Sequence, residues 1–427
     1  MRARRSPLRL VVLLSLLAMF PRPAAAQSTT EIVIEWNRIL QVAAAVPGAL
    51  PPTLFFTRPY AMLHVAMFDA LNSIDYRYRH QIVHANVRGD ATREVAVAQA
   101  AHDVMVAMFP DQSATFDAAL AVTRARFSGA AATEGARVGA DVANAVLAAR
   151  ADDGWNRGPQ TYILADLPGN WQPVPPANAA ATLVHYQDVT PFVVASRLQF
   201  VPEPPPSLTS DRYALDFNEV KRLGGANSTV RTAEQTQIAR AWAGVGYSTS
   251  AWIIWYNLGR DLARARGWDG LDTARAFAML SIAHHDGLLT SFSGKFLYGL
   301  WRPTTAIREA SRDGNAATDP DPTFVSLIPT PPYPSYPGNM ACVGASSNAV
   351  YNAVFGSNTG PFTVTWTGIN QDNVTRTYNS FRQLADEEAV SRIYGGIHYT
   401  FDSTASIGAC NALGTYIAEN AMRSNFQ

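Results

Sequence analysis

The stretch that decides the fold is Ser391-Arg-Ile-Tyr-Gly395-Gly-Ile-His398-Tyr-Thr-Phe-Asp402. Two consecutive glycines, at 395 and 396, predict the point where one helix ends and the chain turns. We expect a second helix to begin near His398, which would put His398 and Asp402 one turn apart on the same face. A carboxylate in that position can hold one imidazole nitrogen and leave the other directed into a pocket.

A second stretch, Lys295-Phe-Leu-Tyr-Gly-Leu-Trp-Arg302-Pro303, carries two cations. If the helix continues to Arg302, where Pro303 should end it, the two side chains lie on nearly the same face, about 10 Å apart along the axis. Taken alone, such a pair is more often two solvated charges than a site. With Arg392 and His398 elsewhere in the chain, the pattern favours convergence on an anion.

The spacing Lys-x6-Arg-Pro followed by Ser-Arg-x3-Gly-x-His-x3-Asp resembles the first and third signature motifs of the superfamily of vanadium haloperoxidases and type 2 phosphatidic acid phosphatases (PAP2). The context from Tyr60 to Asp75, from Arg231 to Gln235 and from Asp286 to Arg308 is similar to its bacterial haloperoxidase-like branch. The resemblance implies an all-α fold, a helical bundle of the PAP2/vanadium haloperoxidase type with long Pro-rich loops and one small β-hairpin.

The resemblance also implies a pocket that binds vanadate, or phosphate in the phosphatases. Lys295, Arg302 and Arg392 would neutralise the oxygens, and His398 would be the metal ligand to vanadium or the nucleophile on phosphorus. Asp402 and Arg392 would join His398 as catalytic residues. Such a compact oxyanion needs several fixed cations, and arginine supplies planar donors that keep their protons.

The second family motif, normally Pro-Ser-Gly-His, departs from the pattern here. After the aromatic, Pro-rich loop 331–337 the chain continues Gly338-Asn339-Met340, so a methionine stands at the usual acid–base histidine. Met340 is a weak acceptor and cannot transfer a proton near neutral pH. Gly338 and Asn339 would still open a helix whose N–H groups, with the Asn339 amide, can bind the oxyanion.

Other histidines offer no evident replacement for the missing one. His64 and His102 lie in apolar helical contexts and are interpreted as core or interhelix hydrogen-bonding residues. His285 precedes Lys295 by nearly three helical turns, too far along the axis to share its site.

The N-terminus has the three parts of a secretory signal peptide. Arginines at 2, 4, 5 and 9 precede an apolar run from Leu10 to Phe20, and three alanines end at Ala26. The run is shorter than the roughly 20 residues that span a bilayer, and no later stretch qualifies. Residues 1–26 are therefore predicted to be removed, leaving a secreted or periplasmic protein with no stable membrane span.

Composition narrows the partners. Hydrophobic residues make up 48% and charged residues 16% of the chain, with 34 Lys+Arg against 34 Asp+Glu. This balance indicates a packed globular protein without the basic surface that nucleic acid needs, so any preference for anions must be local. The only cysteines are Cys342 and Cys410, and the sequence leaves open whether they form a disulfide or remain two buried thiols.

The chain after the signal divides by composition at about residue 210. Residues 27–210 are predicted to form N-terminal helices and a Pro-rich wrapping segment over 154–207. Residues 211–427 are predicted to be a helical core that carries the oxyanion site and packs with the N-terminal helices as one compact unit. Within it we expect helices over 211–223, 232–244, 250–301 with a break at 267–270, 339–354, 382–394 and 398–422, and a hairpin over 362–378.

The function that the resemblance implies is haloperoxidase-like. Vanadate in the pocket would activate hydrogen peroxide for oxidation of a halide or an organic small molecule. Two alternatives stay open: an acid-phosphatase-type phosphomonoester hydrolase acting through phospho-His398, and a non-catalytic oxyanion-binding protein, which the change at 338–340 favours. The sequence does not decide the halide, the organic substrate or the oligomeric state.

Overall fold

The computed structural model describes residues 28–50, 56–245, 251–369 and 372–426, so the predicted signal peptide lies outside the described residues. Helices and two strands make up its regular elements. In chain order they are α1 Thr29–Ala45, α2 Thr57–Asp75, α3 Arg93–Met108, α4 Ser113–Arg124, α5 Gly129–Ala149, α6 Asp211–Gly224, α7 Ala233–Ala243, α8 Ala251–Ala265, α9 Gly270–Tyr298, α10 Pro303–Arg308, α11 Asn339–Phe355, β1 Phe362–Trp366, β2 Val374–Tyr378, α12 Phe381–Tyr394 and α13 Thr400–Asn420. The expected all-α class is confirmed.

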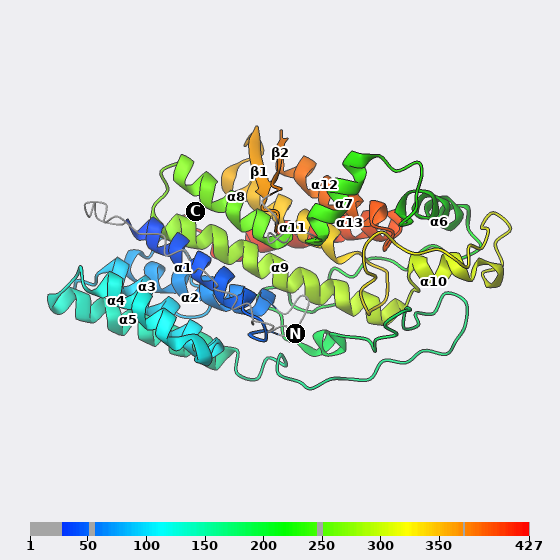
Figure 1. Ribbon diagram of the computed structural model, residues 1–427. Coiled ribbons are helices and arrows are strands. Elements are labelled where there is room, and N and C mark those ends of the chain that lie inside the picture. Colours follow the sequence, from blue (N-terminus) through cyan, green and yellow to red (C-terminus); the bar gives the residue numbers. More distant parts are fainter. Residues whose placement is uncertain (1–27, 51–55, 246–250, 370–371, 427) are drawn as a thin grey trace, which may run out of the picture.

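Helix α9 is the axis of the molecule. It runs lengthwise through the centre of Figure 1, between the N-terminal helices α1–α5 and the C-terminal helices α11–α13. Most of its 29 residues are buried, on nearly every face, which is the pattern of a helix surrounded by others. One cluster of buried side chains extends from Ile32 in α1 to Met422 beyond α13, so both halves of the chain share a core.

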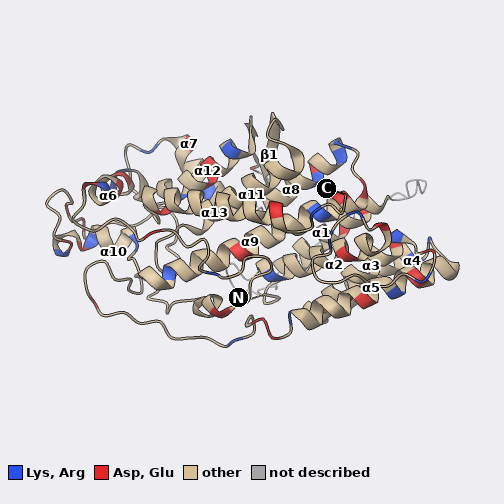
Figure 2. Ribbon diagram, turned by 180° about the vertical axis from the view of Figure 1, so that it is seen from behind, with Lys and Arg blue, Asp and Glu red and all other residues tan. Residues whose placement is uncertain are grey.

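Charge and hydropathy agree with this arrangement. Lys and Arg are interspersed with Asp and Glu over the described elements, and neither sign gathers on one side in Figure 2. None of the described helices combines the length and the apolar character needed to cross a bilayer.

The Pro-rich segment is irregular, as predicted, apart from a short 3-10 helix at Val184–Asp188. In Figure 1 it follows α5 along the lower edge of the molecule. Asp286 in α9 holds it, because its buried carboxylate accepts the backbone N–H groups of Phe192, Val193 and Val194 at 2.8 to 3.1 Å. The predicted hairpin is also present, with Phe362 paired to Tyr378 and Trp366 to Val374.

The prediction that α9 continues to Arg302 is wrong. The helix ends at Tyr298, because Gly299 adopts a left-handed φ of 59° and its N–H bonds the carbonyl of Lys295. The chain then pairs with the wrapping segment: the N–H of Trp301 donates to Gly169 O at 2.8 Å. Lys295 and Arg302 therefore do not share a helical face.

Helix α13 begins at Thr400, two residues later than expected, so His398 lies before it. Gly396 sets this turn, since it has a φ of +78° and its Cα packs on the backbone of Gly224 in α6. A Cβ at Gly396 would meet Gly224 O at 2.2 Å, which leaves no room for a side chain. From the same helix α6, Asp216 accepts the N–H of Phe401 at 2.6 Å and so satisfies the first turn of α13.

Cys342 and Cys410 form a disulfide, which settles the alternative that the sequence left open. Their Cα atoms lie 5.1 Å apart, and the bond joins α11 to α13. These two helices carry Asn339 and Asp402 in their first turns, so the crosslink ties together the elements on which the predicted site depends.

Candidate oxyanion site

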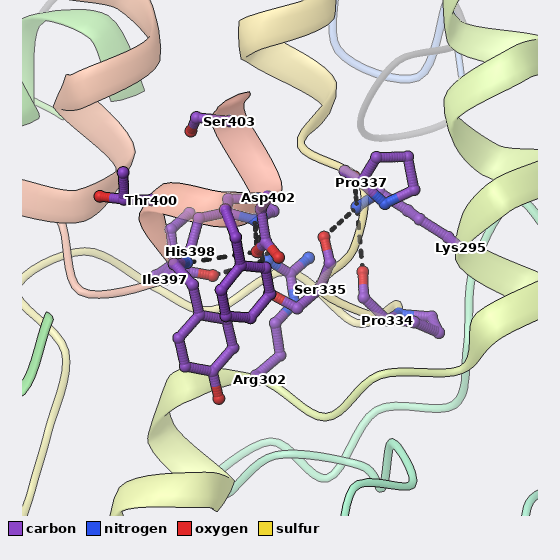
Figure 3. A network of polar contacts seen from close by, with 12 residues as sticks. Lys295, Arg302, Pro334, Ser335, Pro337, Ile397, His398, Thr400, Asp402 and Ser403 are labelled. Carbon is purple, nitrogen blue, oxygen red and sulfur yellow. Dashed lines mark hydrogen bonds and ion pairs between the residues drawn. The ribbon is translucent and has the colours of Figure 1, made fainter. Parts of the chain in front are cut away.

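His398 is fixed in one protonation and orientation by Asp402. The imidazole Nδ1 lies 2.7 Å from Asp402 Oδ2, so Nδ1 carries the proton and donates it, and Nε2 keeps its lone pair (Figure 3). The predicted pairing is present although His398 precedes the helix. Burial lowers the pKa of His398 well below its usual value, and the cations Arg302, Lys295 and Arg392 lower it further. The ring is thus neutral, and its Nε2 is an acceptor, which Arg302 Nη1 contacts at 3.1 Å and which a bound group could use in place of that bond.

Ser335 is a site residue that the sequence analysis missed. Its hydroxyl, in the Pro-rich loop, donates to Asp402 Oδ2 at 2.6 Å, and both side chains are fully buried. The same carboxylate oxygen accepts the N–H of Tyr399 at 3.2 Å. Burial raises the pKa of Asp402 to about 6, and the bond from Ser335 opposes that rise, so Ser335 favours the ionised form that holds His398.

Arg302 reaches the site from the N-cap of α10. Its Nε donates to Tyr333 O at 2.7 Å, and its Nη1 donates to Ile397 O at 2.9 Å and to His398 Nε2 at 3.1 Å. The side chain is fully buried, yet Nη2 has no partner among the described residues. One guanidinium N–H group is therefore available to an acceptor beside the lone pair of His398.

Lys295 has a different role from the one its motif implies. Its Nζ donates to the carbonyls of Pro334, Ser335 and Pro337 at 2.5 to 3.0 Å, which uses all three ammonium protons (Figure 3). Gly294 allows this approach, because a Cβ there would lie 2.8 Å from Pro337. Lys295 thus anchors the Pro-rich loop, and its ammonium group affects the pocket through its charge without contacting a bound anion directly.

A pocket of about 170 Å³ lies over these groups. Arg392, Asn339, Met340 and His398 line it together with apolar side chains from α7 and α8. Arg392 Nε and Nη1 and the amide of Asn339 are buried without a partner in the described part of the chain. Buried donors left unpaired are costly, so the pocket fits a compact, acceptor-rich group. Vanadate and phosphate both meet that description.

Gly338 does not contribute the free N–H that the sequence analysis expected. Its amide donates to the carbonyl of Asp402 at 3.1 Å, which binds the N-cap of α11 to the first turn of α13. Met340 lines the pocket and is 9% exposed, so the position of the missing histidine faces the site. Among the three residues at the position of the second motif, Asn339 is the one whose side chain has unpaired polar atoms at the pocket.

The three other histidines weighed from the sequence, His64, His102 and His285, do not line the pocket. His64 is buried between Asn37 and Ser281, and His102 bridges Asp103 and Asp117 from α3 to α4. His285 lies 3.3 Å from Thr57 Oγ1 and does not line the pocket.

Glu388 is a second residue that sequence reasoning missed. It lies one turn before Arg392 in α12 and is fully buried; Oε2 accepts the indole N–H of Trp255 at 2.9 Å, while Oε1 has no partner among the described residues. Burial raises the pKa of Glu388 to about 8, against the lowering effects of Trp255 and Arg392. A neutral Glu388 at pH 7 leaves Arg392 free for an anion.

We expect sulfate to bind on the order of tenfold more weakly at pH 9 than at pH 7, although sulfate itself is a dianion at both pH values. As the pH rises through about 8, Glu388 loses its proton and its negative charge competes with the anion for Arg392. By linkage, a bound anion neutralises Arg392 and raises the pKa of Glu388, so the protein takes up a proton when the anion binds. Calorimetry across this range checks the effect. Burial also lowers the pKa of Lys295, so Glu388→Gln should remove only the part of the profile that Glu388 contributes, and the half-buried Asp386→Asn should leave the profile unchanged. An identical profile in Glu388→Gln would refute the coupling.

Comparisons with known proteins match the part of the chain that carries these residues. A family model for the VCPO second helical-bundle domain matches residues 275–425, which contain all the site residues above. Vanadium chloroperoxidase from Curvularia inaequalis is 24% identical, over 48% of this chain and 44% of that protein, so the match spans less than half of the relative's length.

Solved structures share the fold over most of the chain. The crystal structure of a bacterial vanadium-dependent iodoperoxidase has a TM-score of 0.76 and 23% identity, and covers 93% of this chain and 97% of that one. The holo-type bacterial vanadium-dependent chloroperoxidase has a TM-score of 0.66 and 14% identity, covering 88% and 96%. From its motifs, its matched domain and its fold, the chain is a vanadium haloperoxidase-like protein.

Proposed function

We propose that the chain binds vanadate in this pocket and uses it to activate hydrogen peroxide for the oxidation of a halide or an organic molecule. The observation that carries the proposal is that Arg302 and Arg392 keep unpaired guanidinium N–H groups at the site of His398, whose Nε2 is an acceptor. Arg302 and Arg392 would hold the oxyanion's charge, Asn339 would donate to an oxygen, and His398 would supply the nitrogen ligand. The relatives named as vanadium-dependent peroxidases support this choice of oxyanion.

Bound vanadate supplies Lewis acidity that makes hydrogen peroxide more electrophilic. The chain's own side chains would position the bound oxyanion and neutralise its charge. Asp402, held by Ser335, keeps the proton on His398 Nδ1, and Lys295 fixes the loop that carries Ser335. In the net reaction hydrogen peroxide, a halide ion and a proton give hypohalous acid and water. Met340 cannot deliver that proton, so water must supply it.

This site should favour halides that are oxidised most easily. We expect turnover in the order iodide, bromide, chloride, with chloride below detection, because weak proton delivery limits the most demanding oxidation most. The mature protein, loaded with orthovanadate, is assayed with hydrogen peroxide and each halide, with unloaded protein as the control. Chloride oxidation as fast as that of iodide would contradict the expected order. If no halide is oxidised in a vanadate-dependent way, the proposed peroxidase activity fails, and only oxyanion binding remains.

Phosphomonoester hydrolysis is the second candidate, favoured by the nucleophile geometry of His398 and Asp402. Without a proton donor at Met340, it would need leaving groups of low pKa. Hydrolysis of 4-nitrophenyl phosphate far faster than of an alkyl phosphate, inhibited by vanadate, would support it; equal rates would count against it.

We also infer that the protein is exported, from the predicted signal peptide and from the disulfide between Cys342 and Cys410, a crosslink typical of oxidising compartments. Mass spectrometry of the protein recovered outside the cytoplasm should give a mature N-terminus at Gln27. An intact N-terminus on a cytoplasmic protein would refute this.

A further inference from the structure

A second and larger cavity, of about 720 Å³, lies beside the oxyanion pocket. Pro331 and Tyr333 line the oxyanion pocket, and Pro332 between them lines the cavity. The N–H of Thr182, which also lines the cavity, donates to Pro332 O at 3.0 Å and ties the wrapping segment to this wall. The two hollows therefore share the chain from Pro331 to Tyr333.

The volumes of the oxyanion pocket and of the second cavity suit ligands of different sizes. The oxyanion pocket, at about 170 Å³, is the smaller of the two and has room for a tetrahedral oxyanion. Pockets that hold organic molecules are commonly about 300 to 1,000 Å³, and the second cavity falls within that range. The larger cavity is therefore the one whose volume suits an organic molecule of two rings or more.

The wall of the cavity is mainly apolar and includes an aromatic face. Trp155 lines it and is 9% exposed, with its ring held by Tyr186 at a centroid distance of 5.7 Å and by the guanidinium of Arg58 at 5.8 Å. Met108 and Val184 supply aliphatic surface. A fixed indole between such side chains favours an aromatic ring as the ligand.

The polar groups in the wall favour a ligand without net charge. Arg157 is paired with Asp188, Nη1 to Oδ2 at 3.1 Å, and Gln160 donates to the same carboxylate. Burial lowers the pKa of His185, so this imidazole is neutral at pH 7. Amide and imidazole groups, including Asn156, can exchange hydrogen bonds with a hydroxyl.

The backbone at Leu183 is an independent indication that this wall is functional. Leu183 lines the cavity, is 4% exposed and has a left-handed φ of 62°, a conformation that bulky side chains rarely adopt. Such backbone strain is retained where the surroundings determine the shape of a site. Here it holds the leucine beside Thr182, which bonds the shared wall.

We propose that this cavity is a second binding site, for a neutral aromatic alcohol. Its ring packs on Trp155 and its hydroxyl hydrogen-bonds to the amide and imidazole groups of the wall. The site goes beyond the proposed function, because no residue of it holds the oxyanion and its occupancy does not require one. A molecule bound here lies against Pro332, next to the pocket in which oxidation is proposed.

The test is calorimetric binding of 2-naphthol to the full mature protein, with naphthalene-2-sulfonate as the charged analogue. We expect 2-naphthol to bind, the sulfonate to bind about tenfold more weakly, and the naphthol affinity to be unchanged by saturating vanadate or by His398→Ala. Ala181→Phe and Ala49→Phe each place a ring in the cavity and should weaken binding about tenfold or more. Exposed Ala180→Phe is the matched control and should bind as the wild type does.

Failure of 2-naphthol to bind, or equal affinity in both filled variants and the control, would overturn the proposal. Competition between 2-naphthol and vanadate would place the naphthol in the oxyanion pocket and overturn it as well. None of these outcomes depends on turnover, so they are distinct from failure of the proposed oxidation. If Ala181→Phe does not fold, Ala49→Phe on the opposite segment still decides.

Discussion

Replacing His398 by alanine is expected to weaken vanadate binding on the order of 100-fold while leaving sulfate binding within a few fold. Vanadate can accept a nitrogen ligand, and His398 Nε2 presents a lone pair beside Arg302. Sulfate forms no such bond and depends on the guanidinium groups of Arg302 and Arg392, which the substitution leaves in place. Calorimetry with each anion gives the two affinities.

A matched control is His284→Ala, because His284 is also buried, hydrogen-bonds Ser347 and does not line the pocket. It should bind both anions as the wild type does. Thermal unfolding of the two variants separates loss of a ligand from loss of the core. Unchanged vanadate affinity in folded His398→Ala would sink the assignment of His398 as the vanadium ligand, and an equal loss of both anions would indicate collapse of the pocket.

The same variant separates oxidation from ester hydrolysis. If His398 acts as a nucleophile on phosphorus, His398→Ala abolishes hydrolysis of 4-nitrophenyl phosphate, and the wild-type protein accumulates an acid-labile phosphohistidine. If only vanadate-dependent oxidation is lost, the phosphatase alternative fails. If neither activity exists in the wild type and sulfate still binds, the chain is an oxyanion-binding protein on this fold.

The sequence identified the residues of the candidate site more successfully than the backbone geometry that brings them together. Its motifs placed Arg302, Arg392, His398 and Asp402 in one site, and the structure brings their side chains together. The helical geometry used to explain this was wrong for Arg302, because the cap at Gly299 depends on pairing with the distant wrapping segment. Local periodicity contains no information about that partner.

Ser335 and Glu388 were missed for a related reason. A serine in a Pro-rich loop is an ordinary loop residue until the loop is folded against Asp402, far along the chain. Glu388 gave a weak signal, a carboxylate one turn before a motif arginine, but only the packing of Trp255 shows that it is buried. The cavity behind Pro332 was equally invisible, since the wrapping segment has no periodicity from which its path could be derived.

Met340→His is expected to raise the rate of vanadate-dependent bromide oxidation by about 10² to 10⁴-fold, the usual contribution of a positioned acid–base group. Met340 is the second residue of α11 and lines the pocket with Asn339 and His398, so a histidine there would face the reacting groups. The nearby guanidinium groups of Arg302 and Arg392 would lower the pKa of the new imidazole, because they disfavour its charged form. The gain should therefore be larger at pH 5 to 6 than at pH 8.

Met340→Leu is the matched control, since it preserves the volume and the apolar character without adding a proton donor, and we expect it to keep the wild-type rate and pH profile. A gain in Met340→His that follows protonation of the imidazole would mean that the site is complete except for proton delivery. No gain in a folded variant that still binds vanadate would mean that another step limits turnover. The departure at Gly338-Asn339-Met340 would then mark a different use of the bound oxyanion, and Asn339, whose amide remains unpaired in the pocket, would be the next residue to replace.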